Sequence, residues 1–332
     1  MLKGGVKCRI SSMAENNNHF DIIIIGSGPA GFTAAIYAVR GGATVALFGG
    51  VAPGGQLLYA AEIENFPGFP EPVAGAELML RMLDQAKRLG VQVFQEDALK
   101  AGLKTAPFTI LAGENKKYTA GAVIIATGAR ARWLGLPSER KYTGKGVSGC
   151  ATCDGFFFRG KEVCVIGGGD TAAEDALFLA KFASKVYLVH RRDKLRACTR
   201  LQEKLGSNPK IEIIYDHVPQ EILGGPALSG AEGEKATGII LKNVKTGAAR
   251  QLDTPGVFIA IGHTPETAIF GDQLKLDDAG YIVADERRQT SIRGVYAAGD
   301  VMDPHYKQAV VAAGSGCVAA MEALKYLEEI KK

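Results

Sequence analysis

Short apolar runs alternate with glycine-rich turns and helix-like stretches along most of this chain. Residues 20–25 are apolar and end at Gly26, a helix-like stretch covers residues 32–39, and a second apolar run covers residues 43–48. A strand, a glycine-rich turn, a helix and a second strand make up the β-turn-α-β unit that binds dinucleotides. The pattern therefore predicts one such unit near the start of the chain.

The same pattern returns in the middle of the chain. Residues 162–166 read as a strand, 167–172 as the turn, 173–182 as the helix and 185–189 as the next strand. Two such units predict an α/β protein with two Rossmann-like, dinucleotide-binding domains. They imply either two bound dinucleotides or one unit that has lost its ligand. Near the end, a short strand closes on Gly299-Asp300, and residues 308–330 have a helical pattern.

The first turn carries the spacing Gly26-x-Gly28-x-x-Gly31, with Ser27, Pro29 and Ala30 between the glycines. The first glycine permits the tight turn, the second lets backbone N–H groups approach a pyrophosphate, and the third lets the helix pack closely. The other interpretation is a purely structural turn. The acidic residue that usually contacts a ribose after the second strand is missing, so Gly55, Gln56 or backbone groups are expected to replace it.

The second turn has the spacing Gly167-x-Gly169-x-x-Ala172, with Asp170 and Thr171 opening the helix. The strand after it runs into basic residues, which are His190, Arg191, Arg192 and, slightly later, Arg196. Arginines at this place accommodate the 2′-phosphate of NADPH through charge-assisted hydrogen bonds. The competing interpretation is a solvated basic turn. Nucleic acid is not favoured, because no aromatic side chains alternate with the charges.

Cysteine use points to redox chemistry. The chain has six cysteines, too few for a disulfide framework at this length, and two of them form the single Cys150-x-x-Cys153. A zinc site would need a second pair of ligands, and the sequence offers none, so no metal is predicted. Asp154 follows directly and could exchange protons with a leaving thiolate. Its alternative role is a helix N-cap or a surface carboxylate.

Overall composition limits the remaining possibilities. Hydrophobic residues make up 47% and charged residues 22% of the 332 residues, and the net charge is +4. This balance is ordinary for a globular protein, and the charge is too small to indicate a nucleic-acid partner. We expect no membrane span, because no apolar run approaches 18 residues. Residues 1–19 read as a disordered leader, with Met13 as an alternative start and a transit peptide as a weaker alternative.

Taken together, these motifs resemble the low-molecular-weight thioredoxin reductases from about residue 20 to the C-terminus. The combination in this order is far more specific than any single motif. The residues that carry the resemblance are Cys150-Ala-Thr-Cys-Asp-Gly-Phe-Phe-Phe158, Gly167-Gly-Gly-Asp-Thr-Ala172, His190-Arg-Arg-Asp193, Gly299-Asp-Val-Met-Asp303, Gly55-Gln56, Glu64-Asn-Phe-Pro-Gly68, Ala126-Thr-Gly128 and Ile261-Gly-His-Thr-Pro265.

The resemblance implies FAD in the first turn and NADPH in the second. It implies a FAD domain split into residues 20–128 and 257–332, with an NADPH domain at 129–256 that is inserted into it and carries the redox pair. Asp300 would contact the ribityl-phosphate part of FAD, and Gln308 and Ala309 would lie near the flavin ring. Further FAD contacts implied in the same way are Gly55, Gln56, Asn65, Thr127, Gly128 and Gly299.

By the same resemblance, electrons would pass from NADPH to FAD, then to the Cys150–Cys153 disulfide and to thioredoxin. Cys153 would face the flavin, Cys150 would attack the partner disulfide, and Asp154 would donate the proton. A cytoplasmic homodimer is also implied. The alternatives are a flavin reductase serving another dithiol protein and a non-catalytic flavoprotein that senses redox state. Because the nicotinamide site and the cysteine pair share one domain, we expect that domain to rotate, with hinges at residues 127–130 and 254–257.

The run of three phenylalanines that follows the cysteine pair is predicted to be core rather than a partner surface.

Overall fold

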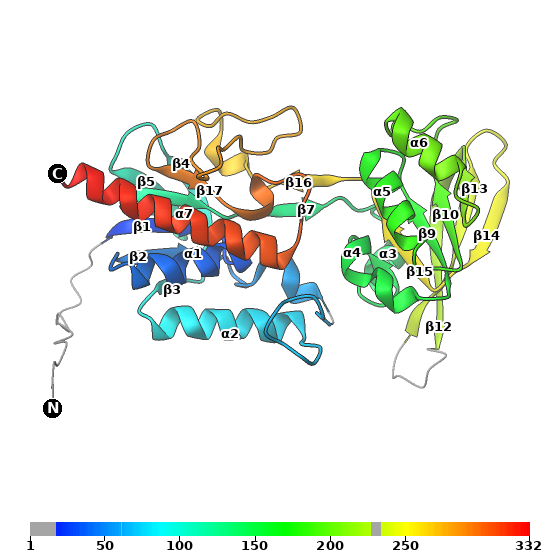
Figure 1. Ribbon diagram of the computed structural model, residues 1–332, viewed down its shortest axis with the longest axis horizontal. Coiled ribbons are helices and arrows are strands. Elements are labelled where there is room, and N and C mark those ends of the chain that lie inside the picture. Colours follow the sequence, from blue (N-terminus) through cyan, green and yellow to red (C-terminus); the bar gives the residue numbers. More distant parts are fainter. Residues whose placement is uncertain (1–17, 61, 227–233) are drawn as a thin grey trace.

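The computed structural model describes residues 18–60, 62–226 and 234–332 as two lobes joined by two short crossing segments (Figure 1). Most of the predicted leader lies outside the described residues. The first lobe is formed by both ends of the described chain, and the second is formed by its middle. This arrangement agrees with a domain inserted into another domain.

The first lobe is built on a seven-stranded sheet in the order β3-β2-β1-β6-β5-β4, with β17 added beside β6. Strands β1, β2, β3, β6 and β17 run parallel, whereas β4 and β5 form an antiparallel extension of β6. The strands are β1 His19–Ile25, β2 Val45–Phe48, β3 Gln92–Phe94, β4 Ala98–Gly102, β5 Phe108–Ala112, β6 Lys116–Ile125 and β17 Val295–Ala297. Its helices are α1 Pro29–Arg40, α2 Gly75–Arg88 and α7 Ala309–Ile330.

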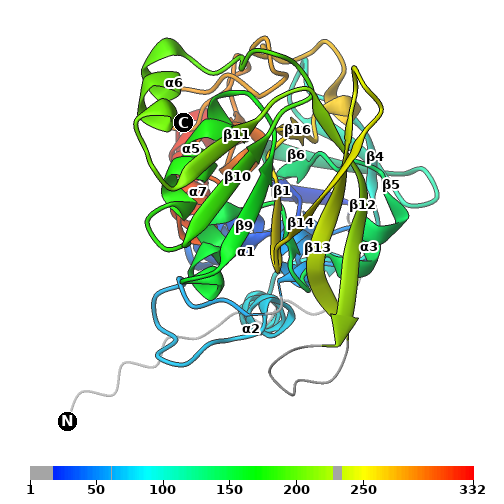
Figure 2. The same ribbon diagram turned by 90° about the vertical axis from the view of Figure 1, so that its right-hand side faces the viewer.

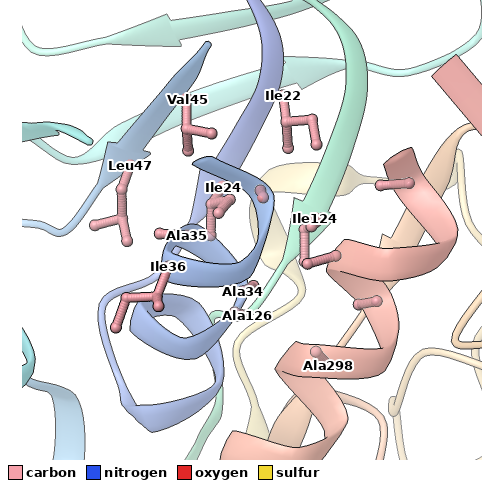
Figure 3. Close-up of a cluster of buried hydrophobic side chains, with 14 of the residues drawn as sticks. Ile22, Ile24, Ala34, Ala35, Ile36, Val45, Leu47, Ile124, Ala126 and Ala298 are labelled. Carbon is pink, nitrogen blue, oxygen red and sulfur yellow. The ribbon is translucent and has the colours of Figure 1, made fainter. Parts of the chain in front are cut away.

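The central strand β1 explains why this sheet is covered on both faces. Ile22, Ile23, Ile24 and Ile25 are all essentially buried, although successive side chains of a strand point to opposite faces. Ile22 and Ile24 pack with α1 and α7 on one face (Figure 3). Ile23 and Ile25 pack with the β4–β5 extension and the segment before β17 on the other face. A continuous apolar run of this kind is typical of a parallel strand between two layers.

Helix α7 is the longest helix among the described residues and is apolar enough to cross a membrane by length and composition alone. Core helices of globular proteins meet the same criterion, so this finding does not contradict the expectation that the chain has no membrane span. In the structure α7 lies against α1, and a Cβ on Gly316 would stand only 2.1 Å from the carbonyl oxygen of Ala30. Such close packing identifies α7 as a core helix of the first lobe, built from small residues that let two helices approach.

The second lobe repeats the plan on a smaller scale (Figure 2). A five-stranded parallel sheet in the order β11-β10-β9-β15-β8 has helices on one face and the antiparallel sheet β12-β13-β14 on the other. Its strands are β8 Val147–Ser148, β9 Glu162–Ile166, β10 Lys185–Val189, β11 Ile211–Ile214, β12 His217–Pro226, β13 Glu234–Asn243, β14 Ala249–Asp253 and β15 Gly256–Ile259. Its helices are α3 Pro137–Tyr142, α4 Ala151–Asp154, α5 Asp170–Leu179 and α6 Thr199–Gly206.

The chain crosses between the lobes on two antiparallel strands, β7 (Ala129–Ala131) and β16 (His263–Pro265). We expected the return crossing at residues 254–257, but β15 pairs with β8 and β9 of the second sheet. The inserted segment therefore continues through Ile259, because the run of apolar residues in β15 completes the parallel sheet. Arg130 and Glu266 form an ion pair of 2.9 Å at the crossing.

Candidate functional site

The first glycine-rich turn connects β1 to α1, and two of its glycines are required by the fold itself. A Cβ on Gly26 would lie 2.1 Å from the carbonyl oxygen of Ala126, and one on Gly31 would lie 2.0 Å from that of Gly26. Gly28, the N-cap of α1, is different, because a Cβ there would meet no atom within 4 Å. The open space at this helix N-terminus fits a pyrophosphate, which the exposed N–H groups would bind.

Loops from distant parts of the sequence gather around this turn. The hydroxyl of Ser27 donates to the carbonyl oxygen of Gly49 at 2.8 Å and accepts from the backbone N–H of Gly54 at 3.1 Å. A Cβ on Gly55 would lie 3.5 Å from the Cα of Gly28, so the loop that carries Gln56 closes over the turn.

The C-terminal part of the chain also packs beside the first glycine-rich turn. A Cβ on Gly299 would stand 2.9 Å from the Cβ of Ala30, and its N–H donates to the hydroxyl of Ser315 at 3.1 Å. The adjacent Asp300 is largely buried, and this burial raises the pKa of its carboxyl to about 6, with Lys307 opposing the shift. Thr127 precedes the crossing strand, and its hydroxyl donates to the carbonyl oxygen of Glu266 at 2.7 Å.

The second turn, between β9 and α5, has the same construction. A Cβ on Gly167 would lie 2.4 Å from the carbonyl oxygen of Ala260, whereas one on Gly169 would meet no atom within 4 Å. Asp170 and Thr171 open α5, and the Asp170 carboxylate accepts the backbone N–H of Cys198 at 2.7 Å. Gly169 is thus the counterpart of Gly28, and the space beside it fits a second pyrophosphate.

The basic segment after β10 wraps around this second turn. The N–H of Arg196 donates to the carbonyl oxygen of Gly168 at 2.6 Å. Arg191, Arg192 and Arg196 are exposed, and within the described part of the chain none of them takes part in an ion pair. Three exposed guanidinium groups without acidic partners can bind a phosphate.

His190 differs from the arginines beside it, because it is 5% exposed and packs against Gly168. Its Nε2 has no hydrogen-bond partner in the protein. Burial lowers the pKa of its imidazole, and the charges of Arg196 and Arg192 lower it further. His190 therefore packs against the second glycine-rich turn as a neutral side chain.

The cysteine pair lies at the start of α4, where Cys150 and Cys153 form a disulfide of 2.04 Å. The Cys150 Sγ accepts the backbone N–H of Cys153 at 3.2 Å. Asp154 ends this single helical turn and is partly buried, which raises the pKa of its carboxyl, while a hydrogen bond from Ser148 opposes the shift. A carboxyl with a raised pKa beside a disulfide can supply a proton to a departing thiolate.

One hydrogen-bonded group joins this pair to the other lobe. The Gln308 Nε2 donates to the Thr152 hydroxyl at 2.8 Å, and the Gln308 Oε1 accepts from the Asn65 Nδ2 at 3.2 Å. Gln308, the N-cap of α7, and Asn65 were both predicted as site residues, and Ala309 begins α7 directly after. The sequence pattern did not single out Thr152, although it is the polar residue between the two cysteines.

Charged groups that the sequence analysis did not identify also influence one another electrostatically across the lobes. Burial raises the pKa of the Asp175 carboxyl in α5 to about 7, with Glu174 adding to the shift and Lys307 opposing it. Burial also lowers the pKa of Lys307, against the attraction of Asp300, Asp303 and Asp175. Lys307 therefore interacts with carboxylates of both lobes, directly beside Gln308.

The phenylalanines after the pair were expected in the core, and this was wrong for two of them. Phe158 packs edge-to-face on Phe258 at 5.4 Å between ring centroids, whereas Phe156 is 53% and Phe157 39% exposed. The guanidinium of Arg159 covers the Phe156 ring at 4.9 Å. Exposed aromatic rings beside the disulfide form a surface that a protein partner could contact.

Comparisons with known proteins agree with this geometry. Residues 20–316 match the model of the pyridine nucleotide-disulphide oxidoreductases. The chain is similar to the thioredoxin reductase of Rickettsia conorii, with 48% identity over 93% of this chain and 98% of that protein. It is similar in structure to a thioredoxin reductase from Giardia duodenalis (TM-score 0.88, 43% identity, 93% of this chain and 99% of that one). A Lactococcus lactis thioredoxin reductase solved in the FR conformation gives a TM-score of 0.61 at 40% identity, again with 93% and 99% covered.

Proposed function

This chain belongs to the pyridine nucleotide-disulphide oxidoreductase family, and we infer that it is a thioredoxin reductase that uses NADPH and FAD. The observation that carries this conclusion is the Cys150–Cys153 disulfide, held through Thr152 against Gln308 of the first lobe. Electrons pass from NADPH through FAD to this disulfide and then to oxidised thioredoxin. Reduction of the partner is thiolate attack through a mixed disulfide.

We propose that FAD binds at the first glycine-rich turn, with Gly28 facing its pyrophosphate. The space at Gly28 and the loop with Gly55 and Gln56 support this proposal. FAD bound at this place would supply the chemistry that transfers electrons between the nicotinamide of NADPH and the disulfide. The chain itself orients the reacting groups, and Asp154, whose carboxyl pKa is raised by burial, would donate a proton to the departing thiolate.

We also propose that the second turn binds NADPH, with Gly169 beside its pyrophosphate and Arg191, Arg192 and Arg196 around its 2′-phosphate. The exposure of the three guanidinium groups and the absence of acidic partners within the described residues support this proposal. A site for NADH would instead place an acidic side chain here to bind the ribose hydroxyls.

Two alternatives remain distinguishable by one assay. The purified protein is incubated with NADPH and a small aromatic disulfide, with and without thioredoxin. A thioredoxin reductase is expected to reduce the small disulfide only when thioredoxin is present. Loss of flavin absorbance without turnover would identify a sensor. Turnover with a different dithiol protein, and not with thioredoxin, would identify a sibling reductase.

We propose that the inserted lobe rotates during turnover about the β7–β16 crossing. In the present arrangement Thr152, between the two cysteines, is hydrogen-bonded to the first lobe, and Cys150 is only partly exposed. The nicotinamide of NADPH, bound to the same lobe, needs access to the same flavin. The flavin therefore cannot contact the cysteine pair and the nicotinamide at the same time. The lower TM-score of the Lactococcus lactis structure, at similar identity and coverage, supports a second arrangement of the lobes.

An engineered crosslink between α5 and the segment that carries Lys307 tests this rotation. It is expected to abolish repeated turnover, because the lobes are held with the cysteine pair against the first lobe. Cleaving the crosslink should restore activity. Full turnover with the crosslink intact would contradict the rotation.

The open space at Gly28 leads to a prediction about cofactor binding. Gly28→Ala is expected to lower FAD affinity strongly, because the new methyl group enters the space proposed for the pyrophosphate. The apoprotein should lose only about 1 kcal/mol or less of stability, since the Cβ meets no protein atom and alanine is merely a poorer N-cap. Fluorescence titration with FAD and thermal unfolding of the apoprotein measure the two effects.

Gly31→Ala serves as the comparison, because its Cβ would collide with the backbone at 2.0 Å. This variant is expected to lose stability even without FAD. If Gly28→Ala retained full FAD affinity, the proposed place of the pyrophosphate would be wrong.

We further propose that the protein is a cytoplasmic homodimer. The resemblance to thioredoxin reductases carries this proposal, and exposed apolar side chains on α7, among them Val310, Val311 and Met321, support an interface. Light scattering of the purified protein at a mass of one chain would contradict it.

A further inference from the structure

A chain of three hydrogen bonds runs from the first lobe to the redox disulfide. The Asn65 Nδ2 donates to the Gln308 Oε1, the Gln308 Nε2 donates to the Thr152 hydroxyl, and the Thr152 Oγ1 lies 3.4 Å from the Cys150 Sγ. We call these three side chains and the Cys150 sulfur the interdomain relay. Asn65 and Gln308 are 243 positions apart in the sequence, and Gln308 and Thr152 are 156 positions apart.

The donors of the relay all point the same way. Because the Thr152 oxygen accepts from Gln308, its own proton is available for the Cys150 sulfur. The same sulfur accepts the backbone N–H of Cys153 at 3.2 Å. Hydrogen bonds aligned in one direction polarise one another, so the amide of Gln308 makes the Thr152 hydroxyl a better donor.

Such an arrangement suits a sulfur that becomes negative. During reduction an electron pair enters at Cys153, the S–S bond breaks, and the bonding pair leaves on Cys150 as a thiolate. The complete reduction takes up two electrons and two protons: the hydride of NADPH supplies both electrons and one proton, and solvent supplies the second. Hydrogen bonds to a thiolate are charge-assisted and therefore stronger than those to the disulfide.

We propose that Thr152 is a catalytic residue that stabilises the Cys150 thiolate, and that Gln308 and Asn65 are positioning residues that make this stabilisation available only when the lobes are docked. Thr152 touches the reacting sulfur, whereas the other two act through it. The inference rests on the proposed function only for the source of the electrons. The hydrogen bonds themselves are independent of the partner protein.

The relay couples the charge on Cys150 to the position of the inserted lobe. If docking favours the thiolate, then the thiolate favours docking to the same extent. Protonation of Cys150 by Asp154 removes the charge and weakens the contact with the first lobe. Protonation of Cys150 thus favours release of the reduced pair toward a partner, and Cys150 must lose this proton again before it attacks the partner disulfide.

The experiment measures the pKa of the Cys150 thiol in flavin-loaded protein carrying Cys153→Ser, so that Cys150 is the remaining thiol of the pair. The rate of alkylation by iodoacetamide is followed against pH, with the Cys150 peptide quantified by mass. Thr152→Val, which removes the hydroxyl at equal size, is expected to reduce the thiolate fraction at neutral pH about tenfold, a pKa shift of about one unit. Thr152→Ser should restore the original profile.

Gln308→Leu tests whether a residue of the first lobe influences the pKa of the Cys150 thiol in the second lobe. It is expected to raise the Cys150 pKa when Thr152 is present and to change nothing in the Thr152→Val background, since the two act in series. Gln92→Leu, an exposed substitution on β3, is the matched control and should leave the profile unchanged.

An unchanged Cys150 pKa in Thr152→Val would overturn the role of Thr152. Equal shifts from Gln308→Leu in both backgrounds would overturn the relay. Because alkylation needs neither NADPH nor thioredoxin, these outcomes are separate from failure of the proposed function, which the thioredoxin assay with the unmodified protein detects.

Discussion

Cys153→Ser is expected to trap thioredoxin on Cys150 as a mixed disulfide, whereas Cys150→Ser is expected to trap nothing. The attacking thiolate forms a bond to the partner sulfur, and the neighbouring cysteine normally resolves it. Without Cys153 the resolving step is lost and the covalent complex accumulates. Non-reducing electrophoresis and mass measurement detect the complex.

Both substitutions should lower turnover of thioredoxin by at least about a thousandfold, as expected when a group that reacts covalently is removed. Both should still bind NADPH, because the second glycine-rich turn is untouched. Cys317→Ser in α7 is the matched control, and it should retain activity because this cysteine contacts Met321 rather than the redox pair. Multiple turnover by Cys150→Ser would show that the cysteine pair does not carry electrons to thioredoxin.

The second large effect concerns the choice of nicotinamide cofactor. Arg191→Ala combined with Arg192→Ala is expected to lower kcat/KM for NADPH by roughly tenfold or more for each arginine, because each hydrogen bond to a charged phosphate contributes about 1.5–3 kcal/mol. NADH has no 2′-phosphate, so its kcat/KM should change little. Steady-state kinetics with both cofactors give the ratio.

Arg88→Ala, at the exposed end of α2, is the control for a general change in charge. It should leave the ratio of NADPH to NADH unchanged. Equal losses with both cofactors in the double variant would mean that Arg191 and Arg192 do not read the 2′-phosphate. Added salt should weaken NADPH binding to the unmodified protein more than NADH binding, since exposed charges are screened.

The sequence by itself determined the two glycine-rich turns and the cysteine pair. Gly31 is fixed by a contact within a single strand-helix turn, because a Cβ there would meet the carbonyl oxygen of Gly26, and the apolar runs of β1, β9 and β10 are long enough to indicate buried parallel strands. Cys150 and Cys153 are three residues apart, so one helical turn brings them together. Local periodicity and short spacings encode features of this kind directly.

Only the tertiary structure decided which surfaces of the two lobes meet. Periodicity records which face of an element is buried, but not where one folded lobe rests on another. Nothing near Thr152 in the sequence indicates that it contacts Gln308, and nothing near Asp175 indicates that the charge of Lys307 acts on its carboxyl. The assignment of β15 to the second sheet and the exposure of Phe156 and Phe157 likewise follow from the packing of distant segments, because strand pairing and side-chain burial depend on partners that the local sequence does not specify.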